Sequence, residues 1–206
     1  SGTVLEREKV AAVLAMGLGV EKAVLPIDVP GCIVDALAGK LDVGLEKTGG
    51  SAEISYSEPY LGSICTMVAE TGADFGYTEF GPVLGGSVFP DPILTSINVL
   101  RFAEDHSLAK TCAAIPDYGR SVSHLEVSCT PLEFSRVLEL QLGDMEDANV
   151  VRNVGWRVEL DGGWFYIRLD EDASVAHLIC ESSDKAFLVG MEEVAQEILQ
   201  RCAIGQ

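Results

Sequence analysis

Basic residues are scarce in this chain of 206 residues, which has 14 Lys and Arg against 32 Asp and Glu and a formal net charge of −18. A chain this negative repels the phosphates of nucleic acids and the anionic surfaces of membranes, so neither is an expected partner. The two halves of the chain carry equal shares of this negative charge, so the charge does not come from an acidic tail. Apolar runs of roughly 18 residues, which would span a bilayer, are also missing.

Paired cysteines are lacking too. The six cysteines are scattered without a C-x-x-C pair, which argues against a zinc site and a disulfide framework. Five lie among apolar residues, where small buried hydrophobic side chains are expected. Reduced thiols are typical of the cytoplasm, which is the predicted location. No signal peptide follows Ser1 and Gly2, which resemble a cloning remnant, so we expect a fragment of a longer chain.

Common catalytic and metal-binding motifs are absent as well. Neither the P-loop pattern G-x-x-x-x-G-K-[ST] nor the hydrolase pattern G-x-S-x-G occurs. Gly17 and Gly19 follow a helical pattern and lack a third glycine, so they predict a helix end rather than a dinucleotide loop. The histidines His106, His124 and His177 are far apart in sequence, which predicts no His-based metal site. His177 lies in an apolar run and is interpreted as a core residue.

The first 119 residues alternate apolar runs with helical patterns. Thr3-x-x-Glu6 is a capping-box pattern, and Asp91 and Ser107 are further expected N-caps. Expected helices cover residues 3–18, 31–37, 58–70, 91–106 and 107–115, and expected strands cover 23–27, 43–47 and 73–76, with a strand or hairpin edge at 85–89. This alternation predicts a three-layer α/β domain with a mainly parallel sheet over residues 1–119.

A different rhythm follows the turn-rich segment 116–120, which is the predicted domain boundary. Expected strands cover residues 122–128, 154–160, 164–169 and 173–180, and expected helices cover 131–142 and 184–201. The run Asp161-Gly162-Gly163 predicts a hairpin turn between two of these strands. Residues 120–206 are therefore expected to form a small α+β domain with helices on one face of an antiparallel sheet.

Most acidic residues of this chain are expected to be solvated side chains on the surface, but one cluster differs from them by its position. Asp170, Glu171 and Asp172 lie between two expected strands, close behind Arg168. A charged turn and a ligand-binding loop are both open interpretations. Binding of a divalent cation would need converging oxygens, which a sequence cannot demonstrate.

Three stretches of the chain together resemble the C-terminal half of the α-D-phosphohexomutase superfamily, which includes phosphomannomutase and phosphoglucomutase. They cover residues 25–28 with 44–48, residues 73–81, and residues 163–172. The first stretch is similar to the strand-helix-strand start of the family's third domain. The second is similar to the sugar-recognition loop A-D-F-G-G-E-x-S-G of that family. The third is similar to the strand before the R-P-S-G-T-E phosphate loop of its fourth domain. The resemblance implies that fold for nearly the whole chain.

The resemblance also implies where ligands would bind. Thr78, Glu79 and Gly81 correspond to the sugar loop, but the carboxylate is displaced by one residue and Phe80 replaces the serine. If this chain is the substrate-binding half of a working phosphohexomutase, the resemblance implies that Thr78 and Glu79 hold sugar hydroxyls.

The implied phosphate loop is altered further. Arg168 and Ser174 would clamp phosphate there, but Asp170, Glu171 and Asp172 replace Ser, Gly and Thr. Two like charges about 4 Å apart repel by roughly 4 kcal/mol at an effective dielectric constant of about 20. We therefore expect the loop not to bind phosphate as the family's loop does.

The family's first two domains, which carry the phosphoserine and the acidic magnesium loop, have no counterpart in this sequence. The resemblance therefore implies no catalytic residue, metal or cofactor in this chain, with Mg²⁺ only in a parent protein. The altered loop most resembles degenerate mutase modules at the C-terminus of nucleotidyltransferases of the mannose-1-phosphate guanylyltransferase type.

Three functions stay open on this basis. The first is a non-catalytic module of nucleotide-sugar synthesis with a structural, regulatory or weak sugar-sensing role. The second is the substrate-binding half of an active phosphohexomutase, and the third is a pure interaction domain. The expected partners are upstream domains of the same chain, a sugar phosphate and further copies in an oligomer.

Overall fold

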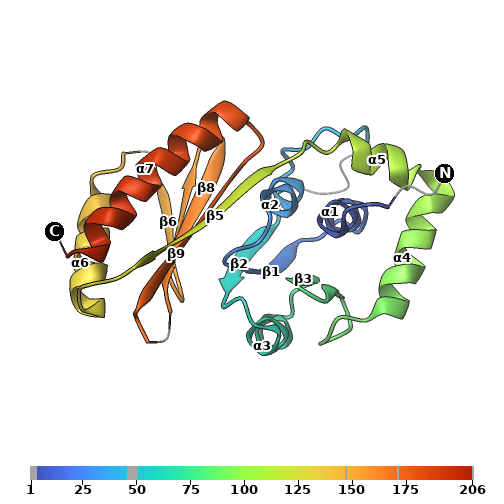
Figure 1. Ribbon diagram of the computed structural model, residues 1–206. Coiled ribbons are helices and arrows are strands. Elements are labelled where there is room, and N and C mark those ends of the chain that lie inside the picture. Colours follow the sequence, from blue (N-terminus) through green and yellow to red (C-terminus); the bar gives the residue numbers. More distant parts are fainter. Residues whose placement is uncertain (1–3, 46–50, 147, 171, 206) are drawn as a thin grey trace. The chain divides into compact units, whose positions relative to one another are not determined.

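The structure is a computed structural model that describes residues 4–45, 51–146, 148–170 and 172–205. The chain divides into two compact units, Ser1–Pro116 and Asp117–Gln206, each built on its own sheet (Figure 1). Within the described residues, no helix is both long and apolar enough to cross a membrane. All six cysteines are free thiols, and all except the half-buried Cys129 are buried, as the sequence predicted.

The first unit is a four-stranded sheet between two layers of helices. Its strands are β1 (Lys22–Pro26), β2 (Glu53–Ser57), β3 (Phe75–Thr78) and β4 (Gly81–Leu84), in the order β2-β1-β3-β4. Strand β1 pairs in parallel with β2 and β3, and only β4 is antiparallel. Its helices are α1 (Arg7–Gly17), α2 (Gly31–Leu37), α3 (Leu61–Thr71), α4 (Pro92–Asp105) and α5 (Leu108–Ala114). Helix α3 lies on one face and α1 and α2 on the other, which confirms the expected three-layer α/β fold (Figure 1).

The expected helix starts of α4 and α5 are confirmed by their caps. The Asp91 carboxylate accepts hydrogen bonds from the N–H groups of Ile93 and Leu94 at 2.8 and 3.0 Å, and the Ser107 hydroxyl caps α5. Helix α1 differs, because it begins at Arg7 and its N-cap residue, Glu6, makes no side-chain capping bond. Thr3 lies outside the described residues. Helix α3 begins three residues later than expected, after Pro59.

Two strand predictions in the first unit are wrong. Val43 and Gly44 form a bend rather than a strand, because Gly44 has a left-handed backbone with φ of 72°. Residues 46 and 47 of that prediction lie outside the described residues, and the second strand in sequence is β2. The segment 85–89 is a turn after β4, closed by the hydrogen bond from the Ser87 N–H to the Leu84 carbonyl at 3.0 Å.

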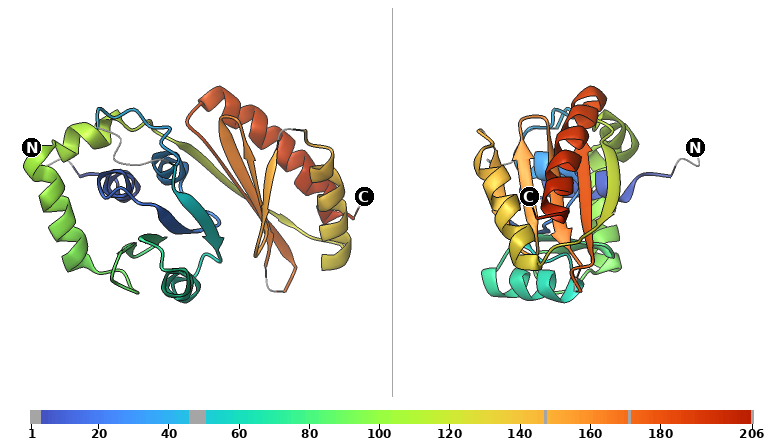
Figure 2. Two further views of the ribbon diagram at one scale, coloured as in Figure 1. Left: turned by 180° about the vertical axis from the view of Figure 1, so that it is seen from behind. Right: turned by 60° about the vertical axis from the view of Figure 1, so that its left-hand side comes forward.

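The second unit is an antiparallel five-stranded sheet with helices on one face, as expected (Figure 2). Its strands are β5 (Gly119–Glu126), β6 (Asn149–Arg152), β7 (Trp156–Leu160), β8 (Gly163–Leu169) and β9 (Val175–Ser182), in the order β5-β9-β8-β7-β6, and its helices are α6 (Pro131–Gly143) and α7 (Lys185–Ala203). Phe134 and Leu138 of α6 pack in one buried cluster with Phe165 of β8 and Leu178 of β9. Strand β6 was not predicted, because it is a four-residue edge strand with no buried residue.

Candidate functional site

The β3–β4 loop holds the three residues that correspond to the sugar loop. Thr78 is buried, and its hydroxyl donates to the Gly81 carbonyl at 2.8 Å and accepts from the Phe80 N–H at 3.1 Å. Gly81 has a φ of 126°, a backbone that favours glycine. The hydroxyl of Thr78 therefore closes the turn, and the turn presents Glu79 and Phe80 at its exposed tip.

A side chain of helix α1 forms a hydrogen bond to this loop. The Arg7 guanidinium donates to the backbone carbonyl of Glu79, whose own carboxylate has no hydrogen bond or ion pair among the described residues. A cavity of about 300 Å³ adjoins the loop and includes Arg7, Phe80 and Gly81 in its walls. Burial raises the pKa of the neighbouring Tyr77 to about 12, so its hydroxyl stays protonated at neutral pH. Glu79 is the one carboxylate that this tip offers to a ligand hydroxyl.

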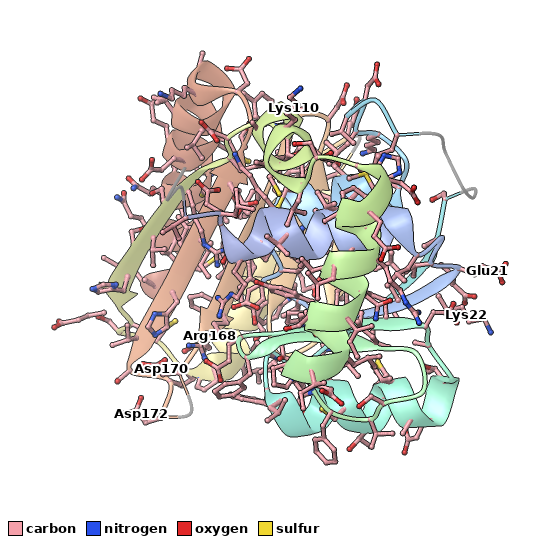
Figure 3. All side chains as sticks on the ribbon, turned by 90° about the vertical axis from the view of Figure 1, so that its right-hand side faces the viewer. Glu21, Lys22, Lys110, Arg168, Asp170 and Asp172 are labelled. Carbon is pink, nitrogen blue, oxygen red and sulfur yellow. The ribbon has the colours of Figure 1, made fainter. Side chains whose placement is uncertain are left out.

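The loop between β8 and β9 holds the residues that correspond to the phosphate loop. Arg168, near the end of β8, is half-buried, and its guanidinium has no hydrogen bond or ion pair among the described residues. The Asp170 carboxylate lies 2.6 Å from Nε2 of His177 on β9. Figure 3 shows Arg168, Asp170 and Asp172 at one end of this sheet.

The other described members of this loop bond to each other. The Asp172 carboxylate accepts from the N–H and the hydroxyl of Ser174 at 3.0 and 2.7 Å, and these bonds lower the pKa of Asp172. Ala173 between them has a left-handed φ of 57°, which non-glycine residues rarely adopt. Glu171 lies outside the described residues. Two of the three acids thus have hydrogen-bond partners of their own, and neither is bonded to Arg168.

Histidine 177 is not the core residue that the sequence predicted. Ala176 and Leu178 point into the core beside α6 and α7, so the alternation of β9 turns His177 to the opposite face, where it is half-buried. Strand register places it opposite both His124 of β5 and Arg168 of β8. The centroids of the two imidazole rings are 6.0 Å apart. The alternation of faces along a strand over residues 175–182 is the sequence signal that would have placed His177 outside the core.

A second polar group on this sheet also escaped the sequence analysis. The guanidinium of Arg157 lies 3.9 Å from the ring centroid of Trp164, and that of Arg120 lies 5.6 Å from the same centroid. Arg120 also pairs with Glu181 at 3.2 Å. These contacts join β5, β7, β8 and β9 at the end of β8 away from the β8–β9 loop, and favour a structural role.

Metal ligands do not converge in the part of the chain that the structure describes, where no three His, Cys, Asp or Glu side chains are placed to hold an ion. The sequence-predicted residues form two groups, with Thr78, Glu79 and Gly81 in the first unit and Arg168, Asp170, Asp172 and Ser174 in the second. What the geometry offers chemically is one free carboxylate, that of Glu79, and one free guanidinium, that of Arg168, among the described members.

No family model and no curated protein matches this sequence. Solved structures do match it. A phosphoglucomutase/phosphomannomutase family protein from Burkholderia thailandensis aligns at 15% identity and a TM-score of 0.71, over 98% of this chain and 43% of its own. The N-acetylphosphoglucosamine mutase of Aspergillus fumigatus aligns at 9% identity and a TM-score of 0.56, over 97% and 44%. An N-acetylglucosamine-phosphate mutase of the α-D-phosphohexomutase superfamily aligns at 7% identity and a TM-score of 0.50, over 94% and 42%.

These alignments cover almost all of this chain but less than half of each matched chain. At such low identity they establish the fold alone. The expected combination of an α/β unit and an antiparallel α+β unit is therefore confirmed. The chain has the fold of the C-terminal domains of phosphohexomutases.

Proposed function

We propose that this chain is a non-catalytic phosphohexomutase-like module that binds a phosphorylated sugar weakly, with Arg168 as its phosphate ligand. The observation that carries the proposal is the half-buried Arg168 guanidinium without a partner among the described residues. The other described cations whose side chains have no such partner are exposed, whereas Arg168 is half-buried; they are Lys22, Arg101, Lys110, Arg136 and Lys185. A guanidinium presents a planar fork of N–H donors that matches two phosphate oxygens, so it suits this ligand better than a lysine would.

The contacts of the neighbouring acids support the same proposal. Asp170 is paired with His177, and Asp172 accepts two hydrogen bonds within its own loop. Neither carboxylate is bonded to Arg168. The acids reduce the affinity for a dianion without occupying the guanidinium, so binding should be weak.

The β3–β4 loop of the first unit is proposed, as a separate site, to contact sugar hydroxyls. Glu79 at its tip has a free carboxylate, and carboxylates accept hydrogen bonds from sugar hydroxyls. Thr78 supports this tip through its bonds to Phe80 and Gly81. We propose no catalytic residue and no cofactor in this chain, because the resemblance assigns the phosphoserine and the magnesium loop to other domains.

The parent protein is proposed to be a nucleotidyltransferase of the mannose-1-phosphate guanylyltransferase type, active in nucleotide-sugar synthesis in the cytoplasm. The alternative is an active phosphohexomutase of which this chain is the substrate-binding half. The reading frame upstream distinguishes them. A glycine-rich nucleotidyltransferase loop there supports the first, and a phosphoserine loop supports the second.

Calorimetry with mannose-1-phosphate and glucose-1-phosphate tests the proposed binding. We expect weak binding that Arg168→Ala abolishes and that Arg136→Ala, an exposed arginine of α6, leaves unchanged. Micromolar affinity lost in Arg168→Ala would favour the substrate-binding half of an active mutase. No heat at millimolar ligand would overturn the proposed binding.

A second candidate function, self-association, is supported by helix α4. Ile93, Ile97 and Leu100 are 73%, 43% and 67% exposed and follow each other at helical spacing, so they form an apolar stripe. The nearest charges along this helix are the capping Asp91 and Arg101. A second copy of the chain could pack there with little of the repulsion that its net charge imposes elsewhere. Sedimentation equilibrium should show a dimer that Ile93→Glu with Leu100→Glu dissociates and Leu140→Glu, exposed on α6, does not.

A further inference from the structure

Three nitrogen-bearing side chains form a row across the sheet of the second unit. The register pairs His177 of β9 with His124 of β5 on one side and with Arg168 of β8 on the other. All three lie on the face opposite α6 and α7. Adjacent strands are about 4.8 Å apart, so one tetrahedral anion can contact two neighbouring members of the row.

The charged groups around this row include few other cations. On β5, Glu126 follows His124 on the same face, and the β8–β9 loop adds Asp170 and Asp172. On β9 and β8, Ile179 and Tyr166 are the next residues on this face. Arg120, Arg157, Glu159 and Glu181 group around Trp164, farther along the strands. Among the described residues, Arg168 is therefore the only cation of the row when both imidazoles are neutral, and it faces the three carboxylates of Glu126, Asp170 and Asp172.

We propose that His124, His177 and Arg168 form an anion site whose affinity for a phosphate group is controlled by protonation of the two imidazoles. This inference rests on the proposed function, because it adds regulation to the Arg168 site. Imidazole is the side chain whose ordinary charge change falls between about pH 5 and pH 8. Protonation of both rings adds two positive charges to the row, and the one on His177 lies beside Arg168. The three cations of the row then equal in number the three carboxylates named above.

The contact of His177 with Asp170 adds to this effect. An imidazolium at His177 neutralises the Asp170 carboxylate 2.6 Å away, so that this acid opposes a bound anion less. His124 is exposed and lies two strands from Arg168, so its charge acts on an anion at Arg168 over a longer distance. The two histidines thus act by different routes, His177 chiefly by cancelling a carboxylate and His124 by adding a positive charge at the far end of the row.

Sulfate is the probe for this site, because its charge, unlike that of a phosphate monoester, does not change between about pH 6 and pH 8. Titration of the whole chain with sulfate, followed by the backbone amide signals in NMR spectra, should give an affinity about tenfold higher at pH 6 than at pH 8. His124→Gln and His177→Gln should each reduce this ratio, and the double variant should remove it. His106→Gln, whose ring lies 4.9 Å from that of Phe102 in the other unit, should keep the full ratio.

The outcomes separate this inference from the proposed function. Sulfate binding that needs Arg168 but is equal at both pH values, or a ratio that persists in the double histidine variant, would overturn the control by histidine and leave the Arg168 site standing. Absence of binding for sulfate and mannose-1-phosphate at both pH values would overturn both. Circular dichroism of each variant checks that its fold is intact.

Discussion

Nε2 of His177 and Oδ1 of Asp170 lie 2.6 Å apart, and this pair joins strand β9 to the loop in which a phosphate site is expected. Asp170 therefore has a partner other than Arg168. The acid nearest to Arg168 in the loop is therefore held by a histidine of the neighbouring strand.

Replacing Asp170 by Asn should strengthen anion binding. The change removes a carboxylate from the surroundings of Arg168 and keeps the size of the side chain. We expect sulfate affinity to rise about threefold to tenfold at pH near 7.5, since one nearby charge contributes on the order of 1 kcal/mol in a well-solvated site. Asp144→Asn, at the C-terminus of α6, is the matched control and should leave the affinity unchanged. Equal affinities of Asp170→Asn and the wild type would show that Asp170 does not oppose the ligand.

Replacing Ala173 by Gly should stabilise the chain or leave its stability unchanged. The left-handed backbone at φ of 57° costs an L-residue roughly 1–2 kcal/mol, and the glycine loses about 0.5–1 kcal/mol of that gain to its freer unfolded state. Urea unfolding should place the midpoint of Ala173→Gly at or above the wild-type value. Ala113→Gly, on the exposed side of α5, should lower the midpoint because it weakens a regular helix. Equal losses in both variants would contradict the strain at Ala173.

Replacing Thr78 by Val should destabilise the first unit by about 1–3 kcal/mol, because the variant leaves the Gly81 carbonyl and the Phe80 N–H without their buried partner. Thr78→Ser keeps the hydroxyl and should retain most of the stability. Denaturant unfolding measures both variants. If Val were tolerated as well as Ser, the role of the hydroxyl in closing the turn would be wrong.

The stability of the second unit should fall in acid partly through Glu139. Hydrogen bonds from Arg152 and Trp156 lower the pKa of the Glu139 carboxyl to about 2. Its folded pKa is below its unfolded value, so the stabilisation is present above about pH 4.5 and is lost as pH falls toward 2. Because the side chain is 41% exposed, solvent screening keeps the gain small.

Glu139→Gln is the variant that tests this. It should be less stable than the wild type at neutral pH, and the difference should shrink as pH falls from about 4.5 toward 2, as followed by thermal unfolding. Glu146→Gln, exposed after α6, serves as the control. A difference between Glu139→Gln and the wild type that stayed constant from neutral pH to pH 2 would argue against the ionised Glu139 as its source.

Several elements were predictable because their signals are local. The Asp91 and Ser107 caps, the hairpin turn at Asp161 to Gly163 and the apolar run of β1 each depend on a few neighbouring residues. Predictions failed where a signal was weak or misleading. The apolar residues around Val43 suggested a strand, but the left-handed Gly44 interrupts it.

The two loops could be located from the sequence, but the partners of their side chains could not. Thr78 was interpreted as a candidate sugar ligand, and only the structure places its hydroxyl on Gly81 and Phe80. His177 was assigned to the core because its neighbours are apolar, although the alternation of a strand turns it to the other face.

The sequence by itself determined the excess of acids, the two kinds of secondary-structure rhythm and the positions of the two loops, because charge, periodicity and turn residues are properties of short segments. The tertiary structure alone decided which acid pairs with which cation and which histidines share a face with Arg168. Those relationships depend on the order and register of strands whose residues are far apart in the chain. The pairing of β5, β9 and β8 brings them together, and no local pattern encodes it.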